Sequence, residues 1–197
     1  MLRSSRLLLA VLPLVMLGGC IKLGSKPPAH LLTLSATGQP TEAASVDQAT
    51  ARTIELAVPD VPRKLATQRV PVQATDTAIA YVKDAQWVDM PRNLFRTLLS
   101  DSLTATGQFV AERSQHAPGV AARLSGDLLD FGIDARSKKA VVTYEATLSF
   151  IGEPRVLRRR FSAEVPARKI NAKRVAAPIS EAAHKVAADV AAWVKEN

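Results

Sequence analysis

The sequence contains little of what most enzyme and metal sites are built from. It has one cysteine, three histidines and 5% aromatic residues in 197 residues. A single cysteine excludes an intramolecular disulfide, and three widely separated histidines would need carboxylates from distant segments to complete a zinc site. The sequence also lacks an HExxH pair, a GxSxG nucleophile elbow and a glycine-rich phosphate loop. We therefore expect a protein that is not an enzyme and that holds no metal or cofactor.

Asp127, Asp130 and Asp134 are the one group of acids that suggests calcium binding or acid–base catalysis. In a strand with regular alternation, Asp127 and Asp130 point to opposite faces and do not converge. We therefore interpret these acids as polar residues of a strand edge and a turn.

The sequence has no apolar run of the roughly 20 residues that a transmembrane helix needs. Its N-terminal apolar run, residues 7–17, is much shorter and follows Arg3 and Arg6. Small residues close this run immediately before the single cysteine. A basic start, a short apolar core and a small-residue cleavage site are typical of a secretory signal. We expect residues 1–19 to be removed as a signal peptide.

The residues at this cleavage site, Leu17, Gly18, Gly19 and Cys20, resemble the lipobox of bacterial lipoproteins. The resemblance implies a diacylglyceryl thioether and an acylated amine on Cys20, and two or three acyl chains anchor a protein stably. Ile21 follows the cysteine in place of an aspartate, which resembles the pattern that sorts enteric lipoproteins to the outer membrane. We expect a lipid-anchored, periplasm-facing protein of the outer membrane, with retention at the inner membrane as the alternative.

The formal net charge of the chain is +8 at pH 7. A basic balance favours anionic partners such as nucleic acid, anionic lipid or an acidic protein face. Export removes nucleic acid from these candidates, and the basic residues do not alternate with aromatic residues as in a groove for single strands. A solvated basic surface is the simplest interpretation of the charge.

Basic residues gather in two places near the C-terminus. Arg158 and Arg160 lie on the polar face of an expected strand, where neighbouring like charges repel unless an anion or an acidic partner answers them. Arg168 and Lys169 lie in the connection to the last expected helix. These four residues are our candidates for docking a protein partner or anionic lipid. The alternative is a strand edge that is protected from aggregation by its charge.

The apolar pattern predicts two helices and a series of strands. A stripe that includes Phe95 runs from Pro91 to a stop at Gly107, and Asp89 and Pro91 suit a helix start. A second, alanine-rich stripe covers residues 178–194. Strand-like segments cover residues 30–34, 53–58, 69–72, 77–82, 109–111, 120–131, 142–150 and 157–165, with a hairpin turn at residues 151–154.

This order of elements predicts an α+β fold in a single domain. We expect an antiparallel or mixed β-sheet with two helices packed on one face. The domain would cover residues 30–197 and would be joined to the membrane by a lipidated tether at residues 20–29.

Several of these features occur in the same order and spacing in a known family. They are Cys20, the 30–34 strand, Trp87 before the 91–107 helix, the strand at 124–131 and a closing helix that contains Trp193 and Val194. In this respect the chain resembles the ABC-type transport auxiliary lipoprotein family, over roughly residues 29–195. That family is encoded with transporters whose periplasmic subunit carries an Mce (MlaD-type) domain, and the lipoprotein of the paraquat-inducible operon is one relative.

The resemblance implies a non-catalytic accessory in the traffic of lipid or hydrophobic compounds between the two membranes. The implied partners are the Mce-domain protein of the same transport system, the membrane through the lipid anchor, and phospholipid as a candidate cargo. A homo-oligomer is compatible with this role. The alternative is a structural or assembly lipoprotein of the outer membrane or of a secretion machine, and an envelope hydrolase is a third hypothesis.

Overall fold

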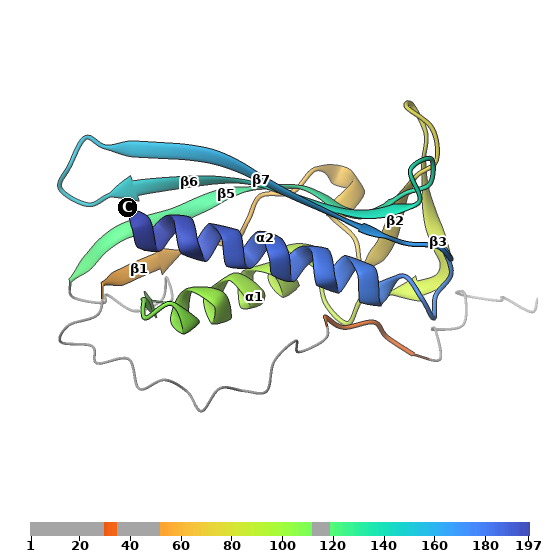
Figure 1. Ribbon diagram of the computed structural model, residues 1–197, viewed down its shortest axis with the longest axis horizontal. Coiled ribbons are helices and arrows are strands. Elements are labelled where there is room, and N and C mark those ends of the chain that lie inside the picture. Colours follow the sequence, from red (N-terminus) through yellow and green to blue (C-terminus); the bar gives the residue numbers. More distant parts are fainter. Residues whose placement is uncertain (1–29, 35–51, 112–118) are drawn as a thin grey trace, which may run out of the picture.

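The computed structural model describes residues 30–34, 52–111 and 119–197, which form one sheet and two long helices (Figure 1). Cys20 and the lipobox residues lie outside the described residues. The elements follow the chain in this order: β1 (Thr53–Leu56), a short 3-10 helix η1 (Arg63–Leu65), β2 (Arg69–Gln73), β3 (Ile79–Gln86), α1 (Pro91–Ala105), β4 (Phe109–Ala111), β5 (Val120–Asp134), β6 (Lys139–Phe150), β7 (Val156–Pro166) and α2 (Ala176–Glu196).

The seven strands form one mixed sheet around β5. Along one side, β5 pairs with β6 in antiparallel fashion, and β6 pairs with β7. Along its other side, β5 pairs in parallel with β1 near its start and with β2 near its end. β4 extends the sheet beyond β1, and β3 extends it beyond β2. The predicted α+β fold with a mixed sheet is confirmed.

Both helices lie on the same face of the sheet, which we call the inner face (Figure 1). The side chains of β6 explain why this face is covered, because its even-numbered residues from Ala140 to Phe150 are buried. The apolar stripe of α1 and the small residues of α2 meet them: Phe95, Leu99 and Leu103 from α1 are fully buried, as are Ala183 and Val186 from α2. The opposite face, which we call the outer face, carries the polar side chains of β6 and β7.

Aromatic side chains fill the centre of the inner face. Phe95 of α1 contacts the Tyr144 ring edge-on, with ring centroids 5.2 Å apart, and Phe131 at 6.5 Å. Trp87, which follows β3, contacts Phe131 at 5.4 Å. These contacts join α1 to the two central strands and to the end of β3.

A β-bulge in β5 corrects one sequence prediction. The pairing of β5 with β6 shifts register between Leu128 and Asp130, so one extra residue lies at Leu129. Leu128 and Phe131 are both buried on the inner face. The extra residue therefore shifts the alternation by one position, and Asp127 and Asp130 lie on the same outer face. The prediction that they point to opposite faces was wrong.

Two further segments differ from prediction at their boundaries. The expected strand at residues 30–34 makes one isolated parallel bridge, between Leu32 and Trp87, rather than a strand. Asp89 was expected to cap α1, but Met90 is the N-cap residue and makes no side-chain cap. Asp89 instead accepts hydrogen bonds from the Met90 backbone and the Asn93 side chain, while Pro91 begins the helix as predicted.

Candidate functional site

The first candidate surface lies on the outer face of β6 and β7. Arg158 and Arg160 both form ion pairs with Glu145 of the neighbouring strand, at 2.5 Å and 3.3 Å. The register of the hairpin places Glu145 opposite Arg160 and one step from Arg158. The Glu145 carboxylate therefore offsets, within the chain, the repulsion that the sequence predicted between the two arginines.

This group of three charges is nevertheless open to a partner. The two arginine side chains are 62% and 60% exposed, whereas Glu145 is 19% exposed. Two cations share one carboxylate, so one positive charge remains in excess. We call Glu145, Arg158 and Arg160 the outer-face charge cluster.

β7 is also an edge of the sheet. Among the described residues, β7 pairs with β6 on one side and with no strand on the other. An edge strand offers unpaired backbone N–H and C=O groups to an added strand, and charged side chains limit uncontrolled pairing. The charge cluster lies on this strand, so the edge combines backbone pairing capacity with positive charge.

The second candidate surface is the loop that connects β7 to α2. Residues 167–175 include Arg168, Lys169, Lys173 and Arg174, all of them exposed, and no acidic residue. Ile170, in the middle of the loop, is 38% exposed. We call residues 167–175 the basic loop.

The fold does not join the outer-face charge cluster to the basic loop. Arg160 and Pro166 lie on the same strand, and the basic loop begins after Pro166. At about 3.3 Å per residue, the strand alone separates the two groups by roughly 20 Å. The four residues predicted as docking candidates therefore belong to two surfaces at different positions along β7.

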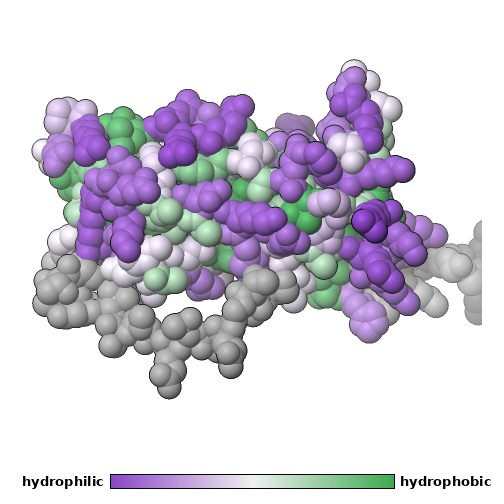
Figure 2. Space-filling view, in the orientation of Figure 1, coloured by the Kyte–Doolittle hydropathy of each residue, from purple (hydrophilic) through white to green (hydrophobic). Residues whose placement is uncertain are grey.

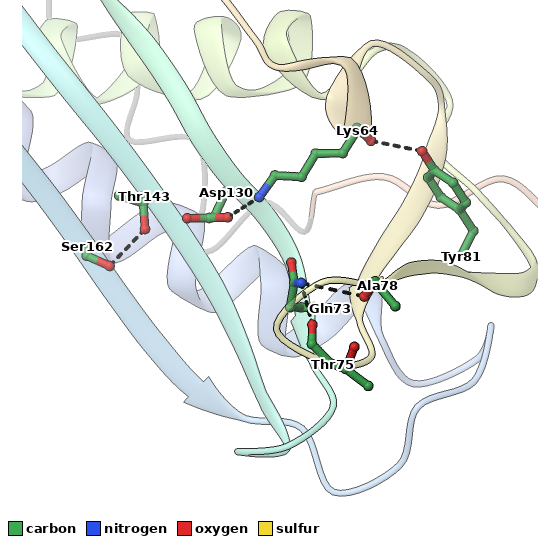
Figure 3. Close-up of polar contacts among 8 residues, drawn as sticks. All are labelled: Lys64, Gln73, Thr75, Ala78, Tyr81, Asp130, Thr143 and Ser162. Atoms are coloured by element: carbon green, nitrogen blue, oxygen red, sulfur yellow. Dashed lines mark hydrogen bonds and ion pairs between the residues drawn. The ribbon is translucent and has the colours of Figure 1, made fainter.

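A shallow hollow on the outer face was not predicted from the sequence. It has a volume of about 230 Å³ and lies between the β2–β3 region and the outer side chains of β5, β6 and β7. The Lys64 ammonium and the Asp130 carboxylate form an ion pair of 2.5 Å at its margin, and the Tyr81 hydroxyl lies 3.4 Å from the Lys64 carbonyl oxygen (Figure 3). This pair forms because the bulge turns Asp130 outward. The signal that could have indicated the bulge is the break in alternation, since a regular strand would bury Asp130 and expose Phe131.

Other polar side chains near this hollow have hydrogen-bond partners of their own. Thr143 and Ser162 share a hydrogen bond of 3.0 Å across β6 and β7, and the Gln73 amide donates to the Thr75 carbonyl in the β2–β3 turn (Figure 3). Its volume of about 230 Å³ is below the roughly 300–1,000 Å³ typical of small-molecule pockets.

Two buried polar atoms on the inner face stand out within the described residues. Trp87 Nε1 and the Tyr144 hydroxyl are buried and have no hydrogen-bond partner there. Burial raises the pKa of Tyr144 well above its ordinary value of 10.0, and the nearby negative charges of Asp127 and Asp60 raise it further. Gly126 leaves room for the Tyr144 hydroxyl, since a Cβ at Gly126 would lie 2.8 Å from that oxygen.

Within the described ranges, no group of three or more histidine, cysteine, aspartate or glutamate side chains is placed to hold a metal ion. His184 uses its Nδ1 atom for a 2.7 Å contact with the Ser180 carbonyl one helical turn earlier, and His116 lies outside the described residues. In the same part of the chain, neither long helix has a stretch apolar enough to cross a membrane.

Comparisons with known proteins connect this fold to a family. The family model of the ABC-type transport auxiliary lipoprotein component matches residues 32–191, which is most of the chain. No curated protein matches the chain.

Solved structures share the fold at low sequence identity. Protein XCC0632 from Xanthomonas campestris is 20% identical, with a TM-score of 0.69, and the match covers 85% of this chain and 94% of that one. The crystal structure of an uncharacterized protein is also 20% identical, with a TM-score of 0.59 over 74% of this chain and 90% of that one.

Proposed function

The chain belongs to the family of ABC-type transport auxiliary lipoprotein components. We propose that it is a non-catalytic accessory of a transport system whose periplasmic subunit carries an Mce (MlaD-type) domain. Its role would be in moving phospholipid or another hydrophobic compound between the two membranes. The observation that carries this proposal is the extent of the family match, residues 32–191, which includes every strand of the sheet, all of α1 and most of α2.

The proposed anchor is Cys20, lipidated after cleavage behind Leu17, Gly18 and Gly19. The tether of residues 21–29 spans at most about 30 Å when fully extended. The folded domain would therefore stay close to the outer membrane and meet its transport partner there, rather than reach across the periplasm.

The proposed docking surface for the Mce-domain partner is the β7 edge with its outer-face charge cluster. Two features support this choice. The free edge can receive an added strand, and the excess positive charge beside it favours an acidic segment. Homo-oligomerisation would use the same edge if β7 of a second copy paired with it, and size-exclusion chromatography of the purified protein distinguishes that case.

The test of this proposal is a crosslinking pull-down from cell envelopes with the full-length protein. We expect the native chain to capture an Mce-domain protein, and we expect Cys20→Ala to abolish this capture because the domain is no longer held at the membrane. Arg158→Glu with Arg160→Glu should reduce capture by at least about tenfold while leaving the protein at the membrane.

A matched control separates a specific surface from net charge. Lys83→Glu with Arg92→Glu reverses two exposed basic residues elsewhere and changes the total charge by the same amount. If both pairs reduce capture equally, the β7 edge is not the docking site. Recovery of assembly machinery with neither a transporter subunit nor lipid would contradict the transport proposal and support the structural alternative.

A further inference from the structure

The two basic surfaces differ in whether their cations form ion pairs with acidic residues of the chain. Arg158 and Arg160 share Glu145 on the outer face. At the other end of β7, Arg136 pairs with Asp76 and Lys139 pairs with Glu164. Within the described part of the chain, the four cations of the basic loop form no ion pair.

A fifth cation belongs to this group. Lys138, in the β5–β6 turn, uses its backbone carbonyl to accept a 2.7 Å hydrogen bond from the Ala167 backbone at the start of the basic loop. The turn and the loop are thereby held together, and the Lys138 side chain adds a positive charge that forms no ion pair with any described residue. The result is a group of five cations that form no ion pair with described residues, beside Asp76 and Glu164, which already pair with Arg136 and Lys139.

The position of this group of cations relates it to the N-terminal tether. Figure 1 shows the basic loop, the β5–β6 turn and residues 30–34 at the same end of the long axis of the molecule. Residues 30–34 are the first described residues after the tether, and the Leu32 backbone fixes them by hydrogen bonds to Gln86 and Val88. Figure 2 shows hydrophilic side chains over this end, as over much of the visible face.

We propose that the basic loop, together with Lys138, binds the anionic phospholipid surface of the membrane that holds the lipid anchor, an inference that rests on the anchor proposed above. Unpaired Lys and Arg side chains close to a lipid anchor are attracted to anionic headgroups, and each adds about fivefold to membrane affinity. Ile170 lies exposed among these cations, so its side chain can enter the interface between headgroups and acyl chains. The contact would hold the outer-face charge cluster roughly 20 Å farther along β7 from the membrane, where a periplasmic partner can reach it.

Charge complementarity and position favour lipid over an acidic protein at this surface. A tether of residues 21–29 keeps residue 30 within about 30 Å of the headgroups, and the basic loop lies at the same end of the molecule. An acidic protein partner would have to enter the same narrow space, whereas the β7 edge remains accessible farther along the sheet.

The test uses the mature chain from residue 20 with Cys20→Ser, which removes the lipid but keeps the whole domain and tether. Binding is measured by co-sedimentation with vesicles of phosphatidylglycerol and phosphatidylethanolamine in equal amounts, and with vesicles of phosphatidylcholine alone. We expect binding to the anionic vesicles to exceed binding to the neutral ones by at least about tenfold. This binding should weaken as the salt concentration rises.

Two variants with the same change in net charge locate the contact. Arg168→Glu with Lys169→Glu should lower the partition coefficient on anionic vesicles by at least about tenfold. Arg158→Glu with Arg160→Glu should lower it less than about threefold, because that pair lies on the other surface. Ile170→Ser should lower it by about twofold to fivefold, and circular dichroism should show an unchanged fold for all three.

Absence of binding by the parent chain, or equal losses for the two charge-reversal pairs, would overturn the inference. If Arg168→Glu with Lys169→Glu abolishes capture of a protein from envelopes while the parent chain does not bind vesicles, the loop binds an acidic protein and the lipid proposal is wrong. No transporter subunit is present in the vesicle experiment, so its failure leaves the transport proposal to its own pull-down test.

Discussion

The inner and outer faces of the sheet are built from the same long strands, β5, β6 and β7, yet they differ in the interactions that their side chains make. On the inner face, apolar and aromatic side chains are buried under α1 and α2. On the outer face, charges pair across strands, with exposed partners such as Arg158 and Lys139. The same backbone therefore supports a closed core on one side and an open, charged surface on the other.

The magnitudes of these interactions show how the two faces share stability and function. Burying one large apolar side chain contributes about 1.5–3 kcal/mol, whereas an exposed ion pair contributes roughly 0–1 kcal/mol. Most of the stability of the domain therefore comes from the inner face. The outer face can be altered at little cost to the fold, which leaves it free for binding.

The largest change in stability is expected for a substitution at the centre of the inner face. Phe95→Ala removes a fully buried ring that contacts Tyr144 and Phe131. The cavity and the lost contacts should lower the free energy of unfolding by about 3–5 kcal/mol, measured by urea denaturation. Arg92→Ala, an exposed change on the same helix, serves as control and should stay within about 0.5 kcal/mol of the native chain. A loss below about 1.5 kcal/mol for Phe95→Ala would mean that the core rearranges to fill the space.

Substitution of Tyr144 should change the free energy of unfolding by less than Phe95→Ala does, and in the opposite direction. Its buried hydroxyl has no partner among the described residues, and a buried polar group without a hydrogen bond is destabilising. Tyr144→Phe removes this group and keeps the ring, so the free energy of unfolding at neutral pH should stay equal or rise by up to about 1 kcal/mol. A loss of stability in urea denaturation would show that the hydroxyl has a hydrogen-bond partner, such as a buried water.

The pH dependence gives a second readout for the same variant. Burial raises the pKa of Tyr144 above 10.0, so the folded state keeps this proton at pH values where the unfolded chain has released it. The unfolded state then binds fewer protons, and stability falls as the pH rises above about 10. The native chain should lose stability more steeply than Tyr144→Phe in this range, and identical slopes would contradict the burial of an ionisable hydroxyl.

The inner face was largely predictable because its signal is periodic. The strand-like pattern over residues 142–150 predicted β6, and the stripe with Phe95 identified the buried side of α1. Such patterns arise directly from the geometry of strands and helices. An antiparallel or mixed sheet with both helices on one face was expected from the order of these elements, and the parallel pairing of β5 with β1 and β2 decides for a mixed sheet.

The outer face was less predictable because its contacts depend on register. Regular alternation continued from Leu128 would bury Asp130 and expose Phe131, so the sequence breaks its pattern at the bulge, but this break does not show that Asp130 meets Lys64. Glu145 and Arg160 become neighbours through the pairing of β6 with β7, which the hairpin turn at residues 151–154 determines. The arginines were recognised from the sequence as candidate docking residues, but their internal partner was not.

The smallest expected effect on stability concerns this internal partner. Glu145→Gln removes the carboxylate shared by Arg158 and Arg160, whose side chains are 62% and 60% exposed. Solvent screens both pairs, so the free energy of unfolding should fall by no more than about 1 kcal/mol, and the difference should shrink in high salt. Glu181→Gln, which removes the partner of Lys185 on α2, is the matched control and should cost a few tenths of a kcal/mol.

The same substitution should have its larger effect on binding. Without Glu145, the β7 edge gains one net positive charge and both guanidinium groups are available to an acidic segment. If this edge is the docking surface, Glu145→Gln should strengthen partner capture in the envelope pull-down, opposite in direction to Arg158→Glu with Arg160→Glu. Weaker capture with an unchanged fold would mean instead that Glu145 holds the two arginines in the geometry that the partner recognises. In that case, orienting the guanidinium donors matters more for binding than the positive charge that Glu145 cancels.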